Sequence, residues 1–155
     1  MNSNFFYFFT FLIVCFACQP NYLYQEEIIL SNATWTYERD VVYSFDIQDT
    51  STTYHLYLDI QHSTQFPFQN LYTNVQTTYP SGRQADSRIS IDLANKLGAW
   101  YGKCKQENCL LRVQLQQNTF FKELGKHEIR FQQYTRKEAL EGVHSLGFIV
   151  EQVKE

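Results

Sequence analysis

The sequence contains little glycine, proline or methionine: six, three and one of these residues among 155. So few Gly and Pro exclude a collagen-like chain and a low-complexity disordered one. Basic residues are also scarce, with 13 Lys and Arg against 16 Asp and Glu, which gives a net charge of −3. Such a balance offers no basic surface to neutralise a row of phosphates. We therefore expect one globular domain and no nucleic-acid partner.

Common catalytic and cofactor motifs are absent as well. There is no Gly-x-Ser-x-Gly elbow, no phosphate-cradling glycine loop, no His-Glu-x-x-His and no Gly-x-Gly-x-x-Gly. The histidines stand singly, with no Cys or carboxylate at ligand spacing, and we interpret them as solvated or hydrogen-bonded. They are His55, His62, His127 and His144. The sequence thus predicts no enzyme, no cofactor and no metal site, and it identifies no small-molecule substrate.

Two weaker patterns keep other functions open. Carboxylates on neighbouring strands can hydrolyse a glycoside when they lie about 5–10 Å apart, although solvent-facing charge is the favoured role for these acids. They are Asp46, Asp49 and Asp59. Aromatic residues on exposed strand faces can stack on sugar rings, although a sandwich core and its rims use the same residue types. These are Tyr57, Tyr72, Trp100 and Tyr101. The alternative function is therefore a lipid-anchored carbohydrate-binding module.

Long apolar runs are missing except at the start of the chain. Residues 5–17 are apolar at every position but Thr10 and carry no charge. Thirteen residues are too few for a spanning helix, which needs about 20, and match the hydrophobic region of a secretory signal. Ala17 is a small residue directly before Cys18, as signal peptidase II requires when it leaves a cysteine for acylation. We predict a lipoprotein signal peptide over residues 1–17 and lipidation of Cys18.

Three other interpretations of this segment remain. Cys15 could be the acylated residue, with Leu12 well placed but Val14 poorly suited to precede the cut. Cleavage by signal peptidase I would leave no lipid. A redox pair of Cys15 and Cys18 is disfavoured, because the two lie in an apolar export segment with no βαβ pattern nearby.

The rest of the chain has the period of two that strands produce. Residues 18–27 show no pattern and are predicted to be a tether, whereas residues 28–155 are predicted to form the domain. Apolar residues alternate with polar ones in seven stretches, which are 41–48, 54–61, 71–79, 88–93, 111–116, 129–131 and 148–150. Short strands separated by polar turns predict an all-β, antiparallel two-sheet β-sandwich of jelly-roll or immunoglobulin-like type.

One short helix competes with the strands, over residues 135–141. Thr135 is a suitable N-cap and Glu138 stands three residues on, as in a capping box. Two turns at most fit before Gly142. A helix this short cannot form a βαβ crossover, which disfavours a parallel sheet.

Two cysteines of the predicted domain, Cys104 and Cys109, bracket four residues. An even number of cysteines fits an oxidising periplasm, and a hairpin would bring these two sulfurs together. We therefore predict a disulfide that tightens this loop. Two free thiols are the other interpretation. A metal site is not predicted, because there is no second pair of ligands.

Three runs carry further information. The first is residues 66–72 (FPFQNLY), with Pro67 and Asn70; the second lies in residues 93–102, with Gly98, Trp100 and Gly102; the third lies in residues 133–148, with Arg136, Gly142 and Gly147. Pro67 excludes helix before the strand at 71. Gly98 and Gly102 let the backbone turn around Trp100, which can then plug one end of the sandwich, and the last two glycines punctuate the final helix and strand.

Taken with Cys18, these runs resemble the GldH family of gliding-motility lipoproteins from the Bacteroidetes. The resemblance spans most of residues 18–155 and implies a non-enzymatic structural or accessory lipoprotein of gliding and of the associated type IX secretion machinery. The implied partners are a membrane, through the lipid, and other envelope proteins of gliding and secretion. Residues 19–22 lack the acidic pair behind the cysteine that is linked in this group to surface display. We therefore expect a periplasm-facing domain.

Overall fold

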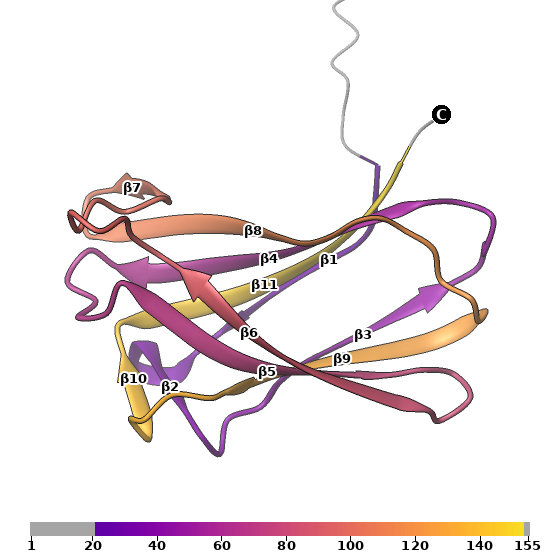
Figure 1. Cartoon of the computed structure of the whole chain (residues 1–155), viewed down its shortest axis with the longest axis horizontal. Helices are drawn as coiled ribbons and strands as arrows, with labels where there is room; N and C mark the ends of the chain where they lie inside the picture. The colour runs from indigo at the N-terminus through magenta and orange to yellow at the C-terminus, as the bar shows by residue number, and fades with distance from the viewer. Residues whose placement is uncertain (1–20, 154–155) are drawn as a thin grey trace, which may run out of the picture.

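The computed structural model describes residues 21–153, which form two antiparallel sheets packed face to face (Figure 1). The five-stranded sheet has the order β1 (Tyr22–Ile29), β11 (Val143–Gln152), β4 (Tyr54–Ser63), β8 (Asn108–Thr119) and β7 (Lys103–Lys105). The four-stranded sheet has the order β3 (Val41–Ile47), β9 (Gly125–Gln133), β5 (Asn70–Thr78) and β6 (Gln84–Asp92). The predicted all-β antiparallel sandwich is confirmed.

A small third sheet closes one end of the sandwich. It pairs β2 (Thr34–Thr36) with β10 (Ala139–Glu141), and a 3-10 turn, η1 (Ser31–Ala33), precedes β2. Leu140 lies opposite Trp35 in this pair, and both side chains are buried. Figure 1 shows β2 and β10 together at the lower left, away from the start of β1 and the end of β11.

The core lies between the sheets because alternate side chains of each strand point inward. In β4 the inward residues Tyr54, Leu56, Leu58 and Ile60 are all buried, while their neighbours are half-buried. Tyr43 of β3 stacks on Phe148 of β11 with 5.5 Å between ring centroids, and its hydroxyl donates to the Leu146 carbonyl at 2.6 Å. Burial raises the pKa of this phenol, so it remains a donor between the sheets.

The predicted helix over residues 135–141 is wrong. Residues 135–138 form bends, and β10 follows directly. The side chain of Gln133 accepts from the Thr135 amide at 2.8 Å and donates to the Lys137 carbonyl at 2.6 Å. These bonds replace the helical ones, and burial of Leu140 against Trp35 outweighs the local capping signal.

The tether predicted over residues 18–27 is also too long. Strand β1 begins at Tyr22 and pairs with β11, with Glu27 opposite Gly147. As the edge strand of its sheet, β1 turns only Tyr24 and Ile28 toward the core, which leaves too weak an apolar pattern to recognise. The signal-peptide and lipidation residues, Cys15 and Cys18 included, lie outside the described residues. Over residues 21–153, no helix is long and apolar enough to cross a membrane.

Candidate functional site

A recess of about 660 Å³ opens between the start of β5 and the segment that leads from β9 to β10. Its lining residues are Phe68, Asn70, Tyr72, Tyr134, Thr135, Arg136, Lys137 and Leu140. The recess therefore joins residues from two of the three runs singled out in the sequence, 66–72 and 133–148, which meet here in space. Of the predicted residues, Asn70 and Arg136 line it directly.

The β5 wall follows from strand geometry. Asn70 and Tyr72 are two residues apart, so they point to the same face, opposite to the buried Leu71. The Asn70 amide donates to the Tyr72 hydroxyl at 3.2 Å, and Tyr72 is 44% exposed. The Tyr134 amide donates to the Tyr72 carbonyl at 3.0 Å, which fixes the two walls relative to each other.

The opposite wall is held by Gln133, which is 5% exposed. Besides its bonds to the Thr135 amide and the Lys137 carbonyl, it accepts from the Thr135 hydroxyl at 3.1 Å and donates to the Glu138 carbonyl at 3.3 Å. A single buried amide thus satisfies four polar groups of the bend. The bend in turn presents Arg136 and Lys137 to the recess.

The floor of the recess is apolar. Leu140 is buried, and Phe68 is half-buried, with its ring edge-to-face against Phe66 at 5.6 Å. A smaller recess of about 410 Å³ adjoins it and shares Phe68 and Lys137. Pro67 and Gly142 line this second recess. Gly142 has φ of +91°, and a Cβ there would lie 3.4 Å from the Phe66 ring, so glycine suits this position.

The chemistry of the lining residues indicates binding. They comprise three aromatic rings, one leucine, a carboxamide, a hydroxyl and two cationic groups. Neither a carboxylate nor a histidine or cysteine is among them. The lining therefore provides a cationic, largely apolar surface of the kind that binds a ligand.

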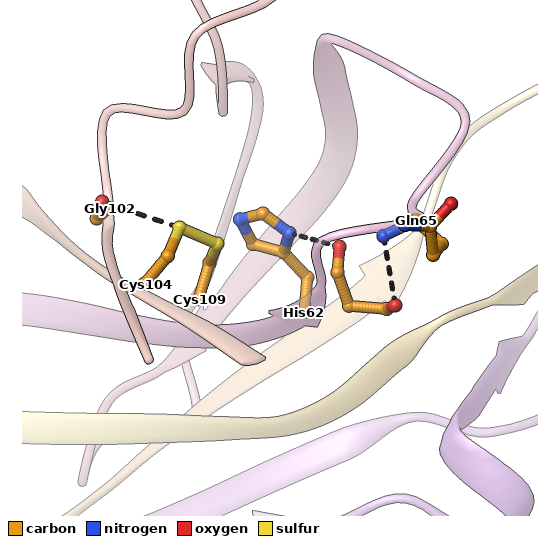
Figure 2. Close-up of a disulfide and its surroundings, with 6 residues drawn as sticks. His62, Gln65, Gly102, Cys104 and Cys109 are labelled. Atoms are coloured by element: carbon orange, nitrogen blue, oxygen red, sulfur yellow. Dashed lines mark hydrogen bonds between the residues drawn. A yellow bond between two sulfur atoms is a disulfide. The ribbon is translucent and has the colours of Figure 1, made fainter. Parts of the chain in front are cut away.

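The other run, residues 93–102, lies elsewhere, beside the disulfide (Figure 2). Gly98 has φ of +82° in a turn where the Asn95 side chain accepts from the Leu97 and Ala99 amides. Gly102 has no such φ; its backbone passes so close to Leu110 that a Cβ would lie 2.8 Å from the Leu110 carbonyl oxygen. The turn places the Trp100 ring 4.6 Å from the His62 ring, edge-on.

Cys104 and Cys109 are directly opposite each other in the β7–β8 hairpin, and the structure joins them in a disulfide. Cys109 is buried and Cys104 is exposed. His62 of β4 is the cross-strand partner of Cys109. Among residues 21–153, no group of three or more His, Cys, Asp or Glu side chains is arranged to hold a metal ion.

His62 and His127 are not solvated, but the Nδ1 atom of each ring forms a hydrogen bond with a backbone carbonyl, as the alternative interpretation expected. Both are fully buried, and the Nε2 atom of each has no hydrogen-bond partner among the described residues. The His62 Nδ1 lies 3.0 Å from the Ser63 carbonyl oxygen, and Figure 2 shows this contact. Burial lowers the pKa of His62, the bond with Ser63 raises it and the nearby His144 lowers it further.

The three acids considered as possible members of a hydrolytic carboxylate pair have different surroundings. Asp59 points outward from the five-stranded sheet, where both of its oxygens accept from Arg112 at 2.7 Å. Asp46 is exposed on the outer face of the four-stranded sheet. Asp49 accepts from Ser51 and Thr52 in a turn, and these hydrogen bonds lower its pKa to about 2. Asp59 therefore lies on a different sheet from Asp46, and Asp49 is occupied by the hydrogen bonds of its own turn.

The aromatic residues considered for sugar stacking do not form one platform either. Tyr57 is on the five-stranded sheet beneath Arg112, with 5.7 Å from the guanidinium carbon to the ring centroid. Tyr72 is on the four-stranded sheet, and Trp100 packs on His62. Tyr101 is 59% exposed, next to β7. Of these four aromatic residues, Tyr72 alone lines the recess.

Sequence reasoning missed the roles of Tyr134 and Lys137. Both lie in or next to the predicted helix, where one exposed aromatic residue and one basic residue do not by themselves indicate a binding site. The usable signal was the parity of β9: His127, Ile129, Phe131 and Gln133 share one face, and all four are buried. A buried glutamine at the end of a strand needs partners, and the adjoining bend supplies them.

Comparison with known proteins agrees with the resemblance found in the runs. The model of the GldH lipoprotein family matches residues 22–150. A protein of Christiangramia forsetii named gliding motility lipoprotein GldH homolog is 26% identical over 97% of this chain and 98% of its own length. The gliding motility lipoprotein GldH of Flavobacterium johnsoniae is 25% identical over 90% of this chain and 91% of its own. The match extends over both sheets and the recess, so this chain belongs to the GldH lipoprotein family.

Proposed function

We propose that this protein is a lipid-anchored lipoprotein of the cell envelope that serves gliding motility as a non-enzymatic structural component. The observation that carries the proposal is the family match over residues 22–150, together with two relatives named gliding motility lipoproteins. The largely apolar, cationic lining of the recess supports a binding role.

The anchor in this proposal is Cys18, acylated after removal of residues 1–17. Strand β1 begins at Tyr22, so four residue steps separate the lipid-bearing cysteine from the sheet. Four extended residues span at most about 14 Å. The sandwich would therefore stand at the membrane surface, facing the periplasm, and would meet partners of the gliding and type IX secretion machinery at high local concentration.

Gene replacement in the bacterium that encodes the chain tests this function. We expect deletion to abolish colony spreading and to reduce adhesin export, and the wild-type gene to restore both. The Cys18→Ser variant should lose palmitate labelling and fail to restore spreading, whereas Cys15→Ser should behave as wild type. Normal spreading and export in the deletion strain would overturn the proposal. Labelling lost in Cys15→Ser alone would move the anchor to Cys15.

A further inference from the structure

We propose that the recess between β5 and residues 134–140 binds an acidic peptide segment that carries one apolar anchor side chain. This inference deepens the proposed function, on which it rests, by naming the chemistry of the envelope partner. Three features of the described residues carry it: unpaired positive charge at the rim, an apolar floor, and walls that are already held in place.

Two neighbouring cations at the rim of the recess have no carboxylate partner among the described residues. Arg83, Arg112 and Arg130 each have a carboxylate oxygen within 4.0 Å. Over residues 21–153, Arg136 and Lys137 have no such partner, and both are exposed. The rim therefore offers two adjacent free positive charges, although the chain as a whole has a net charge of −3. Carboxylates are the groups that complement it, and an arginine can bind one through two parallel hydrogen bonds.

A third cation supports the same face. The Arg88 guanidinium of β6 lies 4.4 Å from the centroid of the Tyr134 ring. Because Tyr134 lines the recess, Arg88 adds positive potential behind this wall. It also covers one face of the only aromatic ring that the bend contributes. A pyranose that stacks between two open aromatic faces is thereby disfavoured.

The floor selects an apolar side chain. Phe68, Tyr72 and Leu140 border a volume of about 660 Å³, which lies within the range for specific ligand sites and accommodates a few amino-acid side chains. An apolar anchor that enters this space removes aromatic and aliphatic surface from water on both partners. Acidic residues on either side of the anchor would then lie near Arg136 and Lys137.

The walls are organised before any ligand arrives. Gln133 satisfies four groups of the bend, and the Thr135 hydroxyl oxygen accepts from the Lys137 amide at 3.3 Å. The bend is further tied to β5 through the Tyr134 amide. Binding therefore orders little of the protein, which favours affinity for a short segment.

Peptide titration of the full-length chain in detergent micelles, followed by nuclear magnetic resonance, tests the inference. The probe is acetyl-Asp-Phe-Glu-amide. Its matched controls are acetyl-Asn-Phe-Gln-amide, which lacks the charges, and acetyl-Asp-Ala-Glu-amide, which lacks the anchor. We expect the acidic Phe probe to shift the amide signals of Tyr72, Tyr134 and Arg136 and to bind at least fivefold more tightly than either control. Added salt should weaken it, because the rim is exposed.

Charge variants locate the binding. Arg136→Gln with Lys137→Gln should reduce affinity for the acidic probe at least fivefold and leave affinity for the uncharged probe unchanged. The matched control is Lys103→Gln with Lys105→Gln, which makes the same charge change on β7, away from the recess. It should leave the affinity for the acidic probe unchanged. Equal affinity for the acidic and uncharged probes would overturn the inference. So would binding of D-glucuronate at the recess with no peptide binding, which would assign the site to an acidic sugar.

The outcome is separable from that of the proposed function. If the peptide binds at the recess and the deletion strain spreads normally, the binding site is supported and the proposed role in motility is overturned. Loss of spreading on deletion without any peptide binding would leave the motility role and remove this ligand.

Discussion

At the scale of single residues, the bend beside the recess depends on Gln133. The Gln133→Ala variant leaves the Thr135 amide and the Lys137 carbonyl without their partner in a place from which water is largely excluded. Unsatisfied buried groups of this kind cost about 1–3 kcal/mol each. We expect the free energy of unfolding, measured by urea denaturation, to fall by about 1–3 kcal/mol because the bend can relax toward solvent.

The loss should be local as well as global. Amide exchange should rise over residues 134–138, while the centre of β11 remains protected. Gln114→Ala is the matched control, since Gln114 is exposed on β8, and it should change the free energy of unfolding by less than about 0.5 kcal/mol. If both variants behave alike, Gln133 does not hold the bend.

His62 gives the domain a dependence on pH. Burial lowers its pKa below the ordinary value of 6.5. Above pH 6.5 the imidazole is neutral in both the folded and the unfolded chain, and its contribution to stability is fully present. As the pH falls through the lower folded pKa, the unfolded chain takes up a proton first, so the free energy of unfolding decreases. We expect urea denaturation to show this decrease between pH 7.5 and pH 5.

Replacing the imidazole distinguishes the contribution of His62 to the pH dependence of stability from the contributions of other titratable groups. The His62→Gln variant should lose part of the decrease below pH 6.5, whereas His55→Gln, on the half-exposed side of the same strand, should retain it. An unchanged slope in His62→Gln would assign the pH dependence to other groups and overturn this prediction.

The burial of His62 was accessible from the sequence, and the identity of its neighbours was not. His62 continues the parity of Tyr54, Leu56, Leu58 and Ile60, so the same alternation that predicted β4 places it on the core face. Its position against Trp100 and Cys109 depends on pairing between β4 and β8 and on the turn that follows β6. Such long-range pairing has no signal in a local pattern.

At the scale of elements, the disulfide is expected to hold β7 to β8. The strand β7 has only three residues, and Cys104 lies opposite Cys109. Closing so short a loop contributes about 2 kcal/mol in the chain-entropy model. We expect Cys104→Ser to lower the free energy of unfolding by about 1–2 kcal/mol, with Cys109 remaining buried as a small apolar thiol.

Hydrogen exchange distinguishes a local from a global effect. Amides of residues 103–105 should exchange faster in Cys104→Ser. The amides of β4 and β11 should exchange faster only to the extent that the free energy of global unfolding falls. Treatment of the wild type with a reducing agent should reproduce the variant. A serine variant as stable as the wild type, with unchanged exchange in β7, would show that strand pairing alone holds this hairpin.

The elements that were predicted correctly are those whose pattern is strong. Strands β3, β4, β5 and β9 bury every second residue, and the alternation alone locates them. Strand β1 was assigned to a tether because an edge strand needs few apolar residues. Residues 135–141 were assigned to a helix because Thr135 and Glu138 match a capping box, while the partner that decides their structure, Trp35 on β2, is about a hundred residues away.

At the scale of the whole molecule, the start of β1 and the recess lie toward opposite ends of the sandwich. Tyr22, the first residue of β1, pairs with Glu151 near the end of β11, and Figure 1 shows this end at the upper right. The other end of β1 leads through η1 into β2, which pairs with β10 beside the recess. An eight-residue strand is about 26 Å long. If Cys18 carries the lipid, as proposed, the recess would lie at the end of the sandwich that is far from the membrane.

This arrangement predicts that the distance between lipid and domain matters for function. Inserting about 20 Gly and Ser residues between Pro20 and Asn21 adds a flexible tether with a root-mean-square length of about 25 Å. We expect palmitate labelling to be unchanged and colony spreading to be reduced severalfold. A partner held at a fixed distance from the membrane would meet the recess less often, because the longer tether lowers the effective concentration of the recess at that distance. The same residues appended after Glu155 control for the added mass and should leave spreading normal. Wild-type spreading with the inserted tether would show that membrane attachment alone is needed, whatever the height of the recess above the lipid.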